Sequence, residues 1–445
     1  MVPPYKLKVL LLGGPNPLND IEVLLKEGVL PQNIYSVESN RKCFNEALIS
    51  IKESRLPVKM YNGELSEFLR CDRQLFDIFY FDACGSFCDG KPNTLDPLLE
   101  LLISNRLSSL CSVITNFAEV KEKKDNYAGM MASYFMGRYN DHPCFEVSEG
   151  FDPAAECYDG NDTKKLILNH FDHFYSEFIT RLLIDFSRFL IPNARALSFS
   201  YLRDQMINFK KLKELFKYQY KEPPVNSAKN VSMDRFLKEY PDWDLVPDAY
   251  PLYTFMKNMP KLCEDTGFFT KILNIEINKQ RLGSVLPLAT FLNAIVEGNW
   301  KFATNKFLES IVGIWYDSDG GLFCDVPLSN LLVNSHLGAM GYPFHPNTRK
   351  MKRYSYIAKK TRMFTDYFIF DRCTEYFEWF PSIEMTSEFL SDPRNQLLAR
   401  CMLDRLGRYD FSSTSHPFRG SAMFSFNKLP CAKAYDIPKR ISVET

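Results

Sequence analysis

The sequence predicts an α/β protein built around a parallel β-sheet, and three observations lead to this prediction. Up to about residue 205, short apolar segments alternate with segments whose apolar residues recur at helical spacing. The apolar segments are hydrophobic at successive positions, as strands are when helices cover both faces of a sheet. Beyond residue 205 this alternation stops, and helical segments mixed with basic and aromatic stretches follow.

Each expected element has its own signal. The strands are short runs of large apolar and β-branched residues, bounded by turn-forming residues. We expect them at 8–14, 33–39, 56–62, 75–87, 109–117 and 194–203. The helices between them show an apolar stripe, and the first ends at Gly28, a residue type that commonly terminates helices. We expect them at 18–28, 41–54, 63–71, 94–107 and about 164–191.

The chain of 445 residues is long enough for two domains. We expect residues 1–205 to form the sheet domain and residues 206–445 a mainly helical α+β accessory region that binds substrate or a partner. The whole chain holds 54 basic and 54 acidic residues, but residues 1–160 contain 16 Lys and Arg against 23 Asp and Glu. The later part is therefore the more basic, which favours an anionic partner there.

Composition disfavours several classes of protein. The N-terminal apolar run is too short for a signal peptide, and no window is apolar over the length that a bilayer requires. The 12 cysteines form no CxxC pair, and the six histidines lack ligand spacing, so we expect no metal site. We expect a cytoplasmic protein with free thiols and no membrane contact.

Glycine and polar residues follow the expected strands. In a parallel sheet the carboxyl ends of the strands meet at one edge, and this edge is where ligands bind. A glycine turn lets a ligand approach the backbone closely, and a carboxylate ending the second strand is suited to ribose hydroxyls. The residues at these ends are, in strand order, Gly13, Gly14 and Asn16, then Glu38, Glu64, Asp82 and Asn116.

With these motifs, residues 5–205 resemble the class I S-adenosylmethionine-dependent methyltransferases, a superfamily with a Rossmann-like sheet. The glycine turn in VLLLGGPNPLND and the acids in IYSVESNRKCFNEAL and VKMYNGELSEFL are similar to the family's cofactor-binding motifs. The resemblance implies S-adenosyl-L-methionine as the cofactor. It also implies the residues that contact this cofactor or its reactive end, namely Gly13, Gly14, Asn16, Glu38, Glu64 and Asp82.

The segment FDIFYFDACGSF is similar to the family's fourth motif, in which a strand ends in Asp and a substrate-facing loop follows. Its D-x-x-G-S arrangement is closest to the loop of tRNA guanine-N2 methyltransferases, and Phe87 would stack on a base. By this resemblance Asp82 orients or deprotonates an amine, and Asn116 helps to hold it. Cytosine-C5 chemistry is disfavoured, because Cys111 lies at the start of the fifth strand rather than beyond its end.

The segment from His345 to Met363 holds seven Lys and Arg residues and no acid. Basic side chains gain affinity for phosphates by releasing counterions, and tyrosines stack on unpaired bases. We expect it to contact nucleic acid, RNA or DNA, although a solvated face packed through its aromatics explains it equally well. Besides Phe87, the expected substrate-binding residues are Arg349, Lys350, Lys352, Arg353, Tyr354, Lys359, Lys360 and Arg362.

The leading hypothesis is a methyltransferase that acts on nucleic acid, with RNA favoured and an exocyclic or ring nitrogen as the acceptor. The rival is a catalytically inactive scaffold or sensor of the same fold, whose helical region binds a partner protein in a larger assembly. Prolines on both sides of Asn16, and a first turn without the usual G-x-G core, favour the rival. The double glycine is also similar to that of aminopropyltransferases, a third and less favoured class.

Overall fold

The computed structural model describes residues 2–83, 85–87, 94–138, 160–192, 195, 208, 303–312, 335–336, 338–399 and 437–443. The chain divides into two compact units. The first comprises Met1–Lys121, Pro346–Arg372 and Ile437–Thr445, and the second comprises Glu122–His345 and Cys373–Asp436. The first unit carries the sheet, and the second is mainly helical over its described residues.

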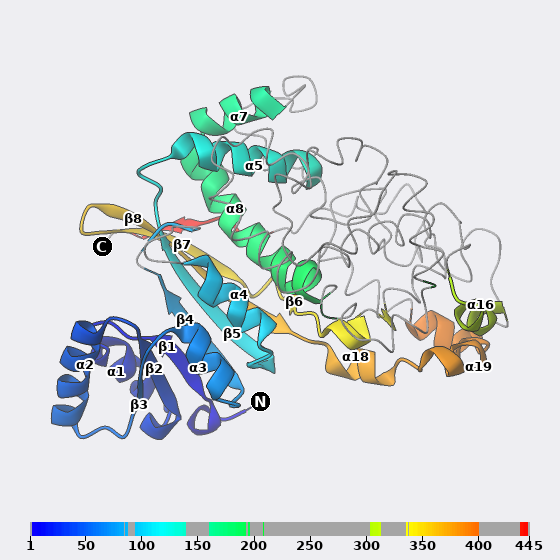
Figure 1. Cartoon of the computed structure of the whole chain (residues 1–445), viewed down its shortest axis with the longest axis horizontal. Coiled ribbons are helices and arrows are strands. Elements are labelled where there is room, and N and C mark those ends of the chain that lie inside the picture. The colour runs from blue at the N-terminus through cyan, green and yellow to red at the C-terminus, as the bar shows by residue number, and fades with distance from the viewer. Residues whose placement is uncertain are drawn as a thin grey trace. The chain divides into compact units, whose positions relative to one another are not determined.

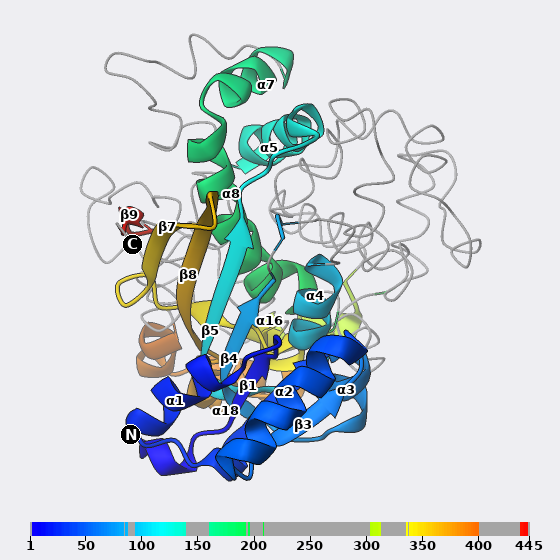
Figure 2. The ribbon, with the colours of Figure 1, turned by 90° about the vertical axis from the view of Figure 1, so that its left-hand side faces the viewer.

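The N-terminal part of the first unit forms parallel strands. They are β1 (Val9–Leu12), β2 (Ile34–Glu38), β3 (Lys59–Asn62), β4 (Phe76–Asp82) and β5 (Leu107–Ala118). Each pairs in parallel with its neighbour in the order β3-β2-β1-β4-β5, and the arrows of β4 and β5 point the same way in Figure 2. The predicted parallel sheet is confirmed, and each of the first five predicted strand segments contains or overlaps one of these strands.

Strands from the C-terminal part of the chain extend this sheet (Figure 1). They are β7 (Lys352–Ala358), β8 (Thr361–Asp371) and β9 (Ile441–Ser442), and a two-residue strand, β6 (His345–Pro346), precedes them. Strand β8 pairs antiparallel with β5 from Leu110↔Asp371 to Ala118↔Met363. Strand β7 pairs antiparallel with β8, and β9 pairs in parallel with β7. The full path is therefore β3-β2-β1-β4-β5-β8-β7-β9.

The positions of β7, β8 and β9 in the sequence differ from the expected domain organisation. The sequence predicts a boundary at residue 205, whereas residues from 352–371 and 441–442 lie in the sheet. The alternating aromatic residues around 354–370 indicate strands, but they carry no local signal for the partner strand. Of the strand predicted at 194–203, only Arg195 is described, and it is helical. Residues 209–302 of the predicted accessory region lie outside the described residues.

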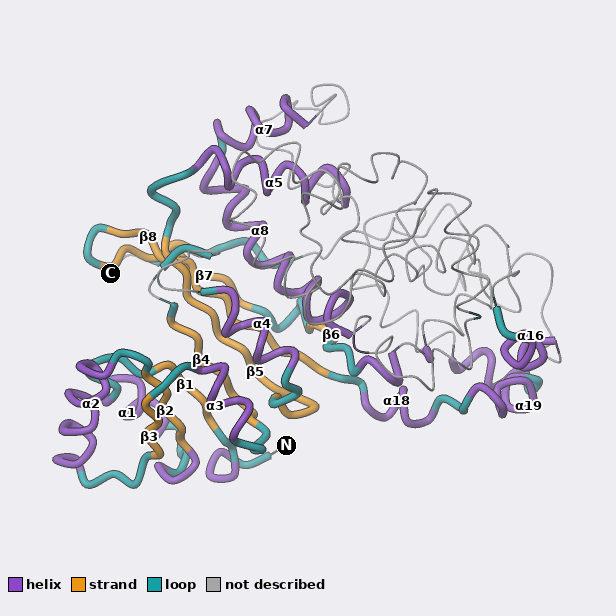
Figure 3. The backbone as a smooth tube through the Cα atoms, viewed as in Figure 1, coloured by secondary structure: helices purple, strands orange, loops and turns teal. Residues whose placement is uncertain are grey.

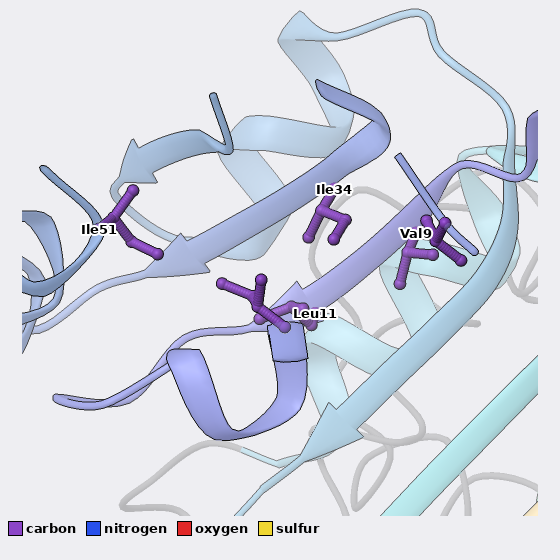
Figure 4. Close-up of a cluster of buried hydrophobic side chains, with 6 residues drawn as sticks. Val9, Leu11, Ile34 and Ile51 are labelled. Atoms are coloured by element: carbon purple, nitrogen blue, oxygen red, sulfur yellow. The ribbon is translucent and has the colours of Figure 1, made fainter. Parts of the chain in front are cut away.

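Helices cover both faces of the parallel strands. Helices α1 (Leu18–Lys26) and α2 (Arg41–Ser54) contribute Ile21 and Ile51 to a buried cluster with Val9, Leu11 and Ile34, part of which Figure 4 shows. On the opposite face, the ring of Tyr35 lies 6.2 Å from that of Phe68 in α3 (Leu65–Cys71). Helix α4 (Leu95–Ile103) and the 3-10 turns Pro4–Lys6 and Pro31–Asn33 complete the described helices of this unit. Because strand side chains alternate, odd-numbered residues of β1 face α1.

The second unit contains α5 (Lys124–Arg138), α7 (Gly160–Asn169) and α8 (Phe171–Asp185), which continues as a π-helical turn, Phe186–Leu190. The helix predicted at about 164–191 is therefore two helices that meet at His170. Short helices follow at α16 (Asn305–Val312), α18 (Thr374–Trp379), the 3-10 turn Ile383–Met385 and α19 (Thr386–Leu390). No helix within the described ranges combines the length and apolar composition that crossing a bilayer requires.

A buried carboxylate fastens the C-terminal segment to the sheet. Asp366 on β8 lies 2.7 Å from the guanidinium of Arg440 and 3.8 Å from that of Arg353 on β7. Arg440 also donates to the backbone carbonyls of Tyr354 and Thr365, at 2.8 and 3.2 Å. Arg353 and Asp366 are 2% and 1% exposed, so the charges depend on each other for compensation.

We predict that Asp366→Ala destabilises the protein by about 3–5 kcal/mol, because it removes the carboxylate that faces the buried guanidinium of Arg353 and the partly buried one of Arg440. Chemical denaturation of the full chain measures this change. The control is Glu22→Ala, which removes an exposed carboxylate from α1 and should change stability by less than about 0.5 kcal/mol. Equal effects of the two substitutions would contradict the prediction.

Candidate active site

The candidate site is a row of residues at the carboxyl ends of the parallel strands. The pairing register places one residue of each strand at the same level, and the row continues across β8 and β7. From one side of the sheet to the other the row consists of Asn62, Glu38, Gly13, Asp82, Asn116, Thr365 and Tyr354. Four residues predicted from the sequence, Gly13, Glu38, Asp82 and Asn116, therefore lie in one line.

The glycine turn after β1 has one closely packed and one open position. The N–H of Gly13 donates to the carbonyl of Val37 at 2.7 Å. A Cβ on Gly13 would lie 2.9 Å from the hydroxyl oxygen of Ser36 and 3.2 Å from Cβ of Glu38, so only glycine fits there without displacement. A Cβ on Gly14 would meet no atom of a described residue within 4 Å. The space beside Gly14 is therefore available to a ligand.

The residues around Glu38 form a polar corner beside this turn. Glu38 Oε1 accepts a hydrogen bond from the N–H of Asn40 at 2.7 Å, and the Asn40 side chain caps α2. The Glu38 carbonyl accepts from the Asn62 side chain at 3.0 Å and from the N–H of Gly63 at 3.1 Å. One carboxylate oxygen of Glu38 is thus fixed, which orients the other.

Two predicted cofactor residues lie just beyond the row and are exposed. Asn16 precedes Pro17, the N-cap residue of α1. Glu64 stands at the N-cap position of α3, and its side chain makes no capping hydrogen bond. Both side chains can therefore rotate toward a ligand at this edge without breaking a hydrogen bond to a described residue.

Asn116 is the centre of a hydrogen-bond network that holds Asp82. Its Nδ2 donates to Asp82 Oδ1 at 3.0 Å and to the Tyr356 hydroxyl at 2.9 Å. Its Oδ1 accepts from the Thr365 hydroxyl at 2.8 Å. Asn116 is only 1% exposed and uses both amide hydrogens within the protein. The sequence predicts that Asn116 contacts the substrate, but its described contacts make it a residue that positions Asp82.

A second acid, Asp20, interacts with Asp82. Asp20 lies in the first turn of α1, on the side of the sheet that Gly13 and Asp82 also face. Partial burial raises the pKa of the Asp20 carboxyl, and the negative charge of Asp82 raises it further. At the edge of the sheet near β4, the charge of Asp82 therefore opposes the ionisation of Asp20.

The predicted stacking residue Phe87 is not available to a base in this structure. Its ring is fully buried and lies edge-on against Phe117, with ring centroids 5.2 Å apart. The neighbouring Thr94 hydroxyl donates to the Ser86 carbonyl at 2.9 Å, which fastens the end of this loop. The prediction treats Phe87 as substrate-facing, because a sequence window does not show that Phe117 lies beside it.

Cys111 is not a nucleophile here. Its thiol is buried within β5, and this burial raises its pKa to about 12, so the thiolate is scarce at neutral pH. The location of Cys111 within the sheet agrees with the sequence argument against cytosine-C5 chemistry.

The basic segment is divided by the structure into different environments. Arg349, Lys350 and Lys352 are exposed and lie before or at the start of β7. Arg353 is buried in the ion pair with Asp366, so it does not serve as a substrate contact. Tyr354 is half-buried in the row. The remaining predicted residues, at or beside the turn between β7 and β8, are Lys359, Lys360 and Arg362, all exposed.

Sequence reasoning missed three residues of the network, namely Asp20, Tyr356 and Thr365. Asp20 is visible as an acid just after the glycine turn, and that proximity is the signal that could have found it. Tyr356 and Thr365 reach Asn116 only through the pairing of β8 with β5, and no local pattern announces that pairing.

The order and directions of the strands define the fold of the first unit. Five parallel strands in the order β3-β2-β1-β4-β5, extended by the antiparallel β8 and then β7, form the Rossmann-like sheet of the class I methyltransferase fold. The predicted fold class is confirmed. No protein-family model and no curated protein matches the chain.

Several solved structures with partial likeness to this chain are methyltransferases. A SAM-dependent methyltransferase from Archaeoglobus fulgidus is 15% identical over 28% of this chain and 49% of its own, with a TM-score of 0.19. PKMT2 from Rickettsia typhi, in complex with AdoHcy, is 14% identical over 42% of this chain and 34% of its own, with a TM-score of 0.22. Protein arginine methyltransferase 10 from Arabidopsis thaliana is 16% identical over 38% and 48%, with a TM-score of 0.19.

The matched region spans about half, or less, of each of these solved chains. The fold assignment therefore rests on the strand order of this chain rather than on these matches.

We predict that Gly13→Ala and Gly14→Ala separate the two positions of the turn. Gly13→Ala should destabilise the protein by about 1–3 kcal/mol, because the new methyl group displaces Ser36 or Glu38. Gly14→Ala should change stability by less than about 0.5 kcal/mol, because its methyl group enters open space. Chemical denaturation of both variants measures the difference, and a larger loss for Gly14→Ala would refute this geometry.

A second prediction concerns Asp20 and pH. Because the folded-state pKa of Asp20 is raised, ionisation of this carboxyl costs stability as pH rises from its ordinary pKa of 3.8 through the raised pKa. Asp20→Asn should therefore stabilise the protein at pH 7, and the gain should vanish below pH 3.8. Melting temperatures of both proteins across this range measure the gain. In an Asp82→Asn background the gain should shrink but persist, since burial is the larger cause.

Proposed function

We propose that the protein is an S-adenosylmethionine-dependent methyltransferase. The observation that supports this most directly is the row at the carboxyl edge of the sheet, with open space beside Gly14. In parallel α/β sheets this edge is where ligands bind. The row contains accessible backbone at the glycine turn and a carboxylate on each side of it, from Glu38 and Asp82. This arrangement suits a ligand with a cationic centre and hydroxyl groups.

The residues present fit this cofactor. Gly13, Gly14 and Asn16 would hold its methionine part, and the free oxygen of Glu38 would accept from ribose hydroxyls. Glu64, exposed and without a capping bond, would accept from the adenine amino group. When bound, the cofactor supplies a methyl group activated on a sulfonium. The AdoHcy complex of PKMT2 from Rickettsia typhi supports the choice by analogy only.

Asp82 is the residue we assign to the reactive end. Methyl transfer to an amine needs a positioned nucleophile and an acceptor for the proton that it loses. Asn116 fixes Oδ1 of Asp82 by its hydrogen bond, and Tyr356 and Thr365 fix Asn116 in turn. The carboxylate is thereby held in one orientation at the row, where it would orient or deprotonate the amine.

We infer a nucleic-acid substrate, with RNA favoured and an exocyclic or ring nitrogen as the methyl acceptor. The support is the exposed basic side chains that flank the turn between β7 and β8, in the same unit as the row. Basic side chains contribute affinity for phosphates in a sequence-independent manner. The burial of Phe87 removes one expected stacking contact, so base recognition in this proposal rests on other residues at the edge.

A second candidate function is a repurposed scaffold or sensor of the same fold whose helical region binds a partner protein. Two observations favour it. Asn116 donates both of its amide hydrogens to groups within the protein, and Phe87 is buried, so neither side chain is available to contact a substrate. In this case the row would be a structural remnant, and S-adenosylmethionine would not bind.

Calorimetric titration of the full chain with S-adenosylmethionine tests the proposal. We predict binding to the wild type, about tenfold weaker binding to Gly14→Ala, and unchanged folding of that variant. Asp82→Ala should keep cofactor affinity within about threefold but reduce methyl transfer from labelled cofactor to bulk RNA by at least about 100-fold.

The outcomes separate the two candidate functions. A folded wild type that releases no heat at high cofactor concentration excludes the methyltransferase and leaves the scaffold. Cofactor binding with undiminished transfer by Asp82→Ala keeps the methyltransferase but moves its reactive end elsewhere.

A further inference from the structure

The turn between β7 and β8 has an unusual backbone for its sequence. Lys359 and Lys360 join the two strands directly, as the short loop in Figure 3 shows, and Ala358 pairs with Thr361. Both lysines have left-handed backbone angles, with φ of 48° and 66°. A two-residue hairpin of this kind strongly prefers Asn-Gly, because those residues tolerate positive φ. Among the described residues they are the one consecutive non-glycine pair with positive φ.

The strain at this turn is not compensated by contacts of the lysine side chains. Both are exposed, and neither ammonium makes a hydrogen bond or ion pair with a described residue. Residues that are held in disfavoured backbone regions, without stabilising contacts that offset the strain, often serve a function. No contact of the lysine side chains with a described residue therefore offsets the strain of the turn.

The turn carries further positive charge. Arg362 is exposed two residues after Lys360. Lys121, three residues after the end of β5, donates to the Thr361 hydroxyl at 2.7 Å, which brings a fourth cation to the turn. The carboxylate of Glu119 lies 3.9 Å from the Lys121 ammonium. We call Lys121, Lys359, Lys360 and Arg362 the hairpin tip.

The register places the hairpin tip at the same edge of the sheet as the row. Strand β7 runs in the direction of β5, because each is antiparallel to β8. The Ala358–Thr361 pair lies four residues beyond the Tyr354–Thr365 pair, which is about 13 Å further along the strands. A ligand that contacts both the hairpin tip and Asp82 must therefore extend over more than this distance. A small anion is too short, and a polyanion is long enough.

We propose that the hairpin tip binds the phosphate backbone of a single-stranded nucleic acid whose base is presented to the row. This inference rests on the proposed function and narrows the residues that bind the substrate's phosphates to four. One of them, Lys121, lies outside the predicted basic segment. Arg353 is not one of these residues, because its charge is neutralised by Asp366 within the sheet.

The test replaces the strained pair by the residues that the turn prefers. Lys359→Asn with Lys360→Gly relieves the backbone and removes two charges, so we predict a melting temperature about 1–4 °C higher. Affinity for a fluorescent single-stranded RNA, measured by anisotropy against salt, should fall about tenfold or more. The slope of log affinity against log salt should become shallower by about 1.4, the value for two lost phosphate contacts.

A matched control removes two exposed lysines elsewhere in the same unit. Lys26→Gln with Lys52→Gln, on α1 and α2, should leave RNA affinity and salt slope within about twofold and 0.3 of wild type. An Asn-Gly variant that is more stable yet binds RNA with unchanged affinity and slope overturns the proposal. So does wild-type binding to phosphatidylserine vesicles without binding to RNA.

Failure of this inference is distinguishable from failure of the proposed function. If S-adenosylmethionine binds but the tip variants leave RNA binding unchanged, the methyltransferase stands and the tip assignment falls. If the cofactor does not bind but the Asn-Gly variant loses RNA affinity, the tip assignment stands as a nucleic-acid site on an inactive scaffold.

Discussion

The antiparallel pairing of β8 with β5 is the interaction on which the rest of the first unit depends. It joins successive residues from Leu110↔Asp371 to Ala118↔Met363, two segments far apart in the chain. Without β8, the edge of β5 would expose unpaired backbone N–H and C=O groups. Strands β7 and β9 join the sheet only through β8. The same pairing brings Thr365 to Asn116, so it shapes the site as well as the fold.

The charged residues on the opposite face of the β7–β8 hairpin also hold the C-terminal strands in place. Asp366 holds Arg440, and Arg440 in turn binds the backbone of β7 and β8 beside the row. On the site face, Tyr356 and Thr365 fix Asn116, which fixes Asp82. Strands β7 and β8 therefore each contribute a side chain that holds Asn116, which in turn positions Asp82.

The parts of the fold with a local cause could be predicted from the sequence. The periodicity of apolar residues marks β1 to β5 and the helices between them, and the direction of parallel strands then places Gly13, Glu38, Asp82 and Asn116 at one edge. Glu64 follows from the same reasoning at β3. These inferences need only alternation and the chain direction, which a sequence window contains.

The parts that depend on long-range contacts could not. Phe87 reads as a substrate-facing ring until Phe117 is placed beside it, and Arg353 reads as an exposed cation until Asp366 neutralises it. The effect of Asp82 on Asp20 requires α1 to lie on the same face of the sheet as the end of β4. The domain boundary at residue 205 fails to anticipate the sheet for the same reason, since the partner of β5 is encoded near residue 365.

Hydrogen exchange of the full chain with and without S-adenosylmethionine tests the central claim most directly, because it reports where the cofactor binds. The account predicts slower exchange in peptides that cover the turn after β1 and the end of β2, from Gly13 to Asp20 and from Glu38 to Cys43. Exchange at the turn of Lys359 and Lys360 should not change. Protection confined to the second unit, or none at saturating cofactor, would contradict the assignment of the row as the cofactor site.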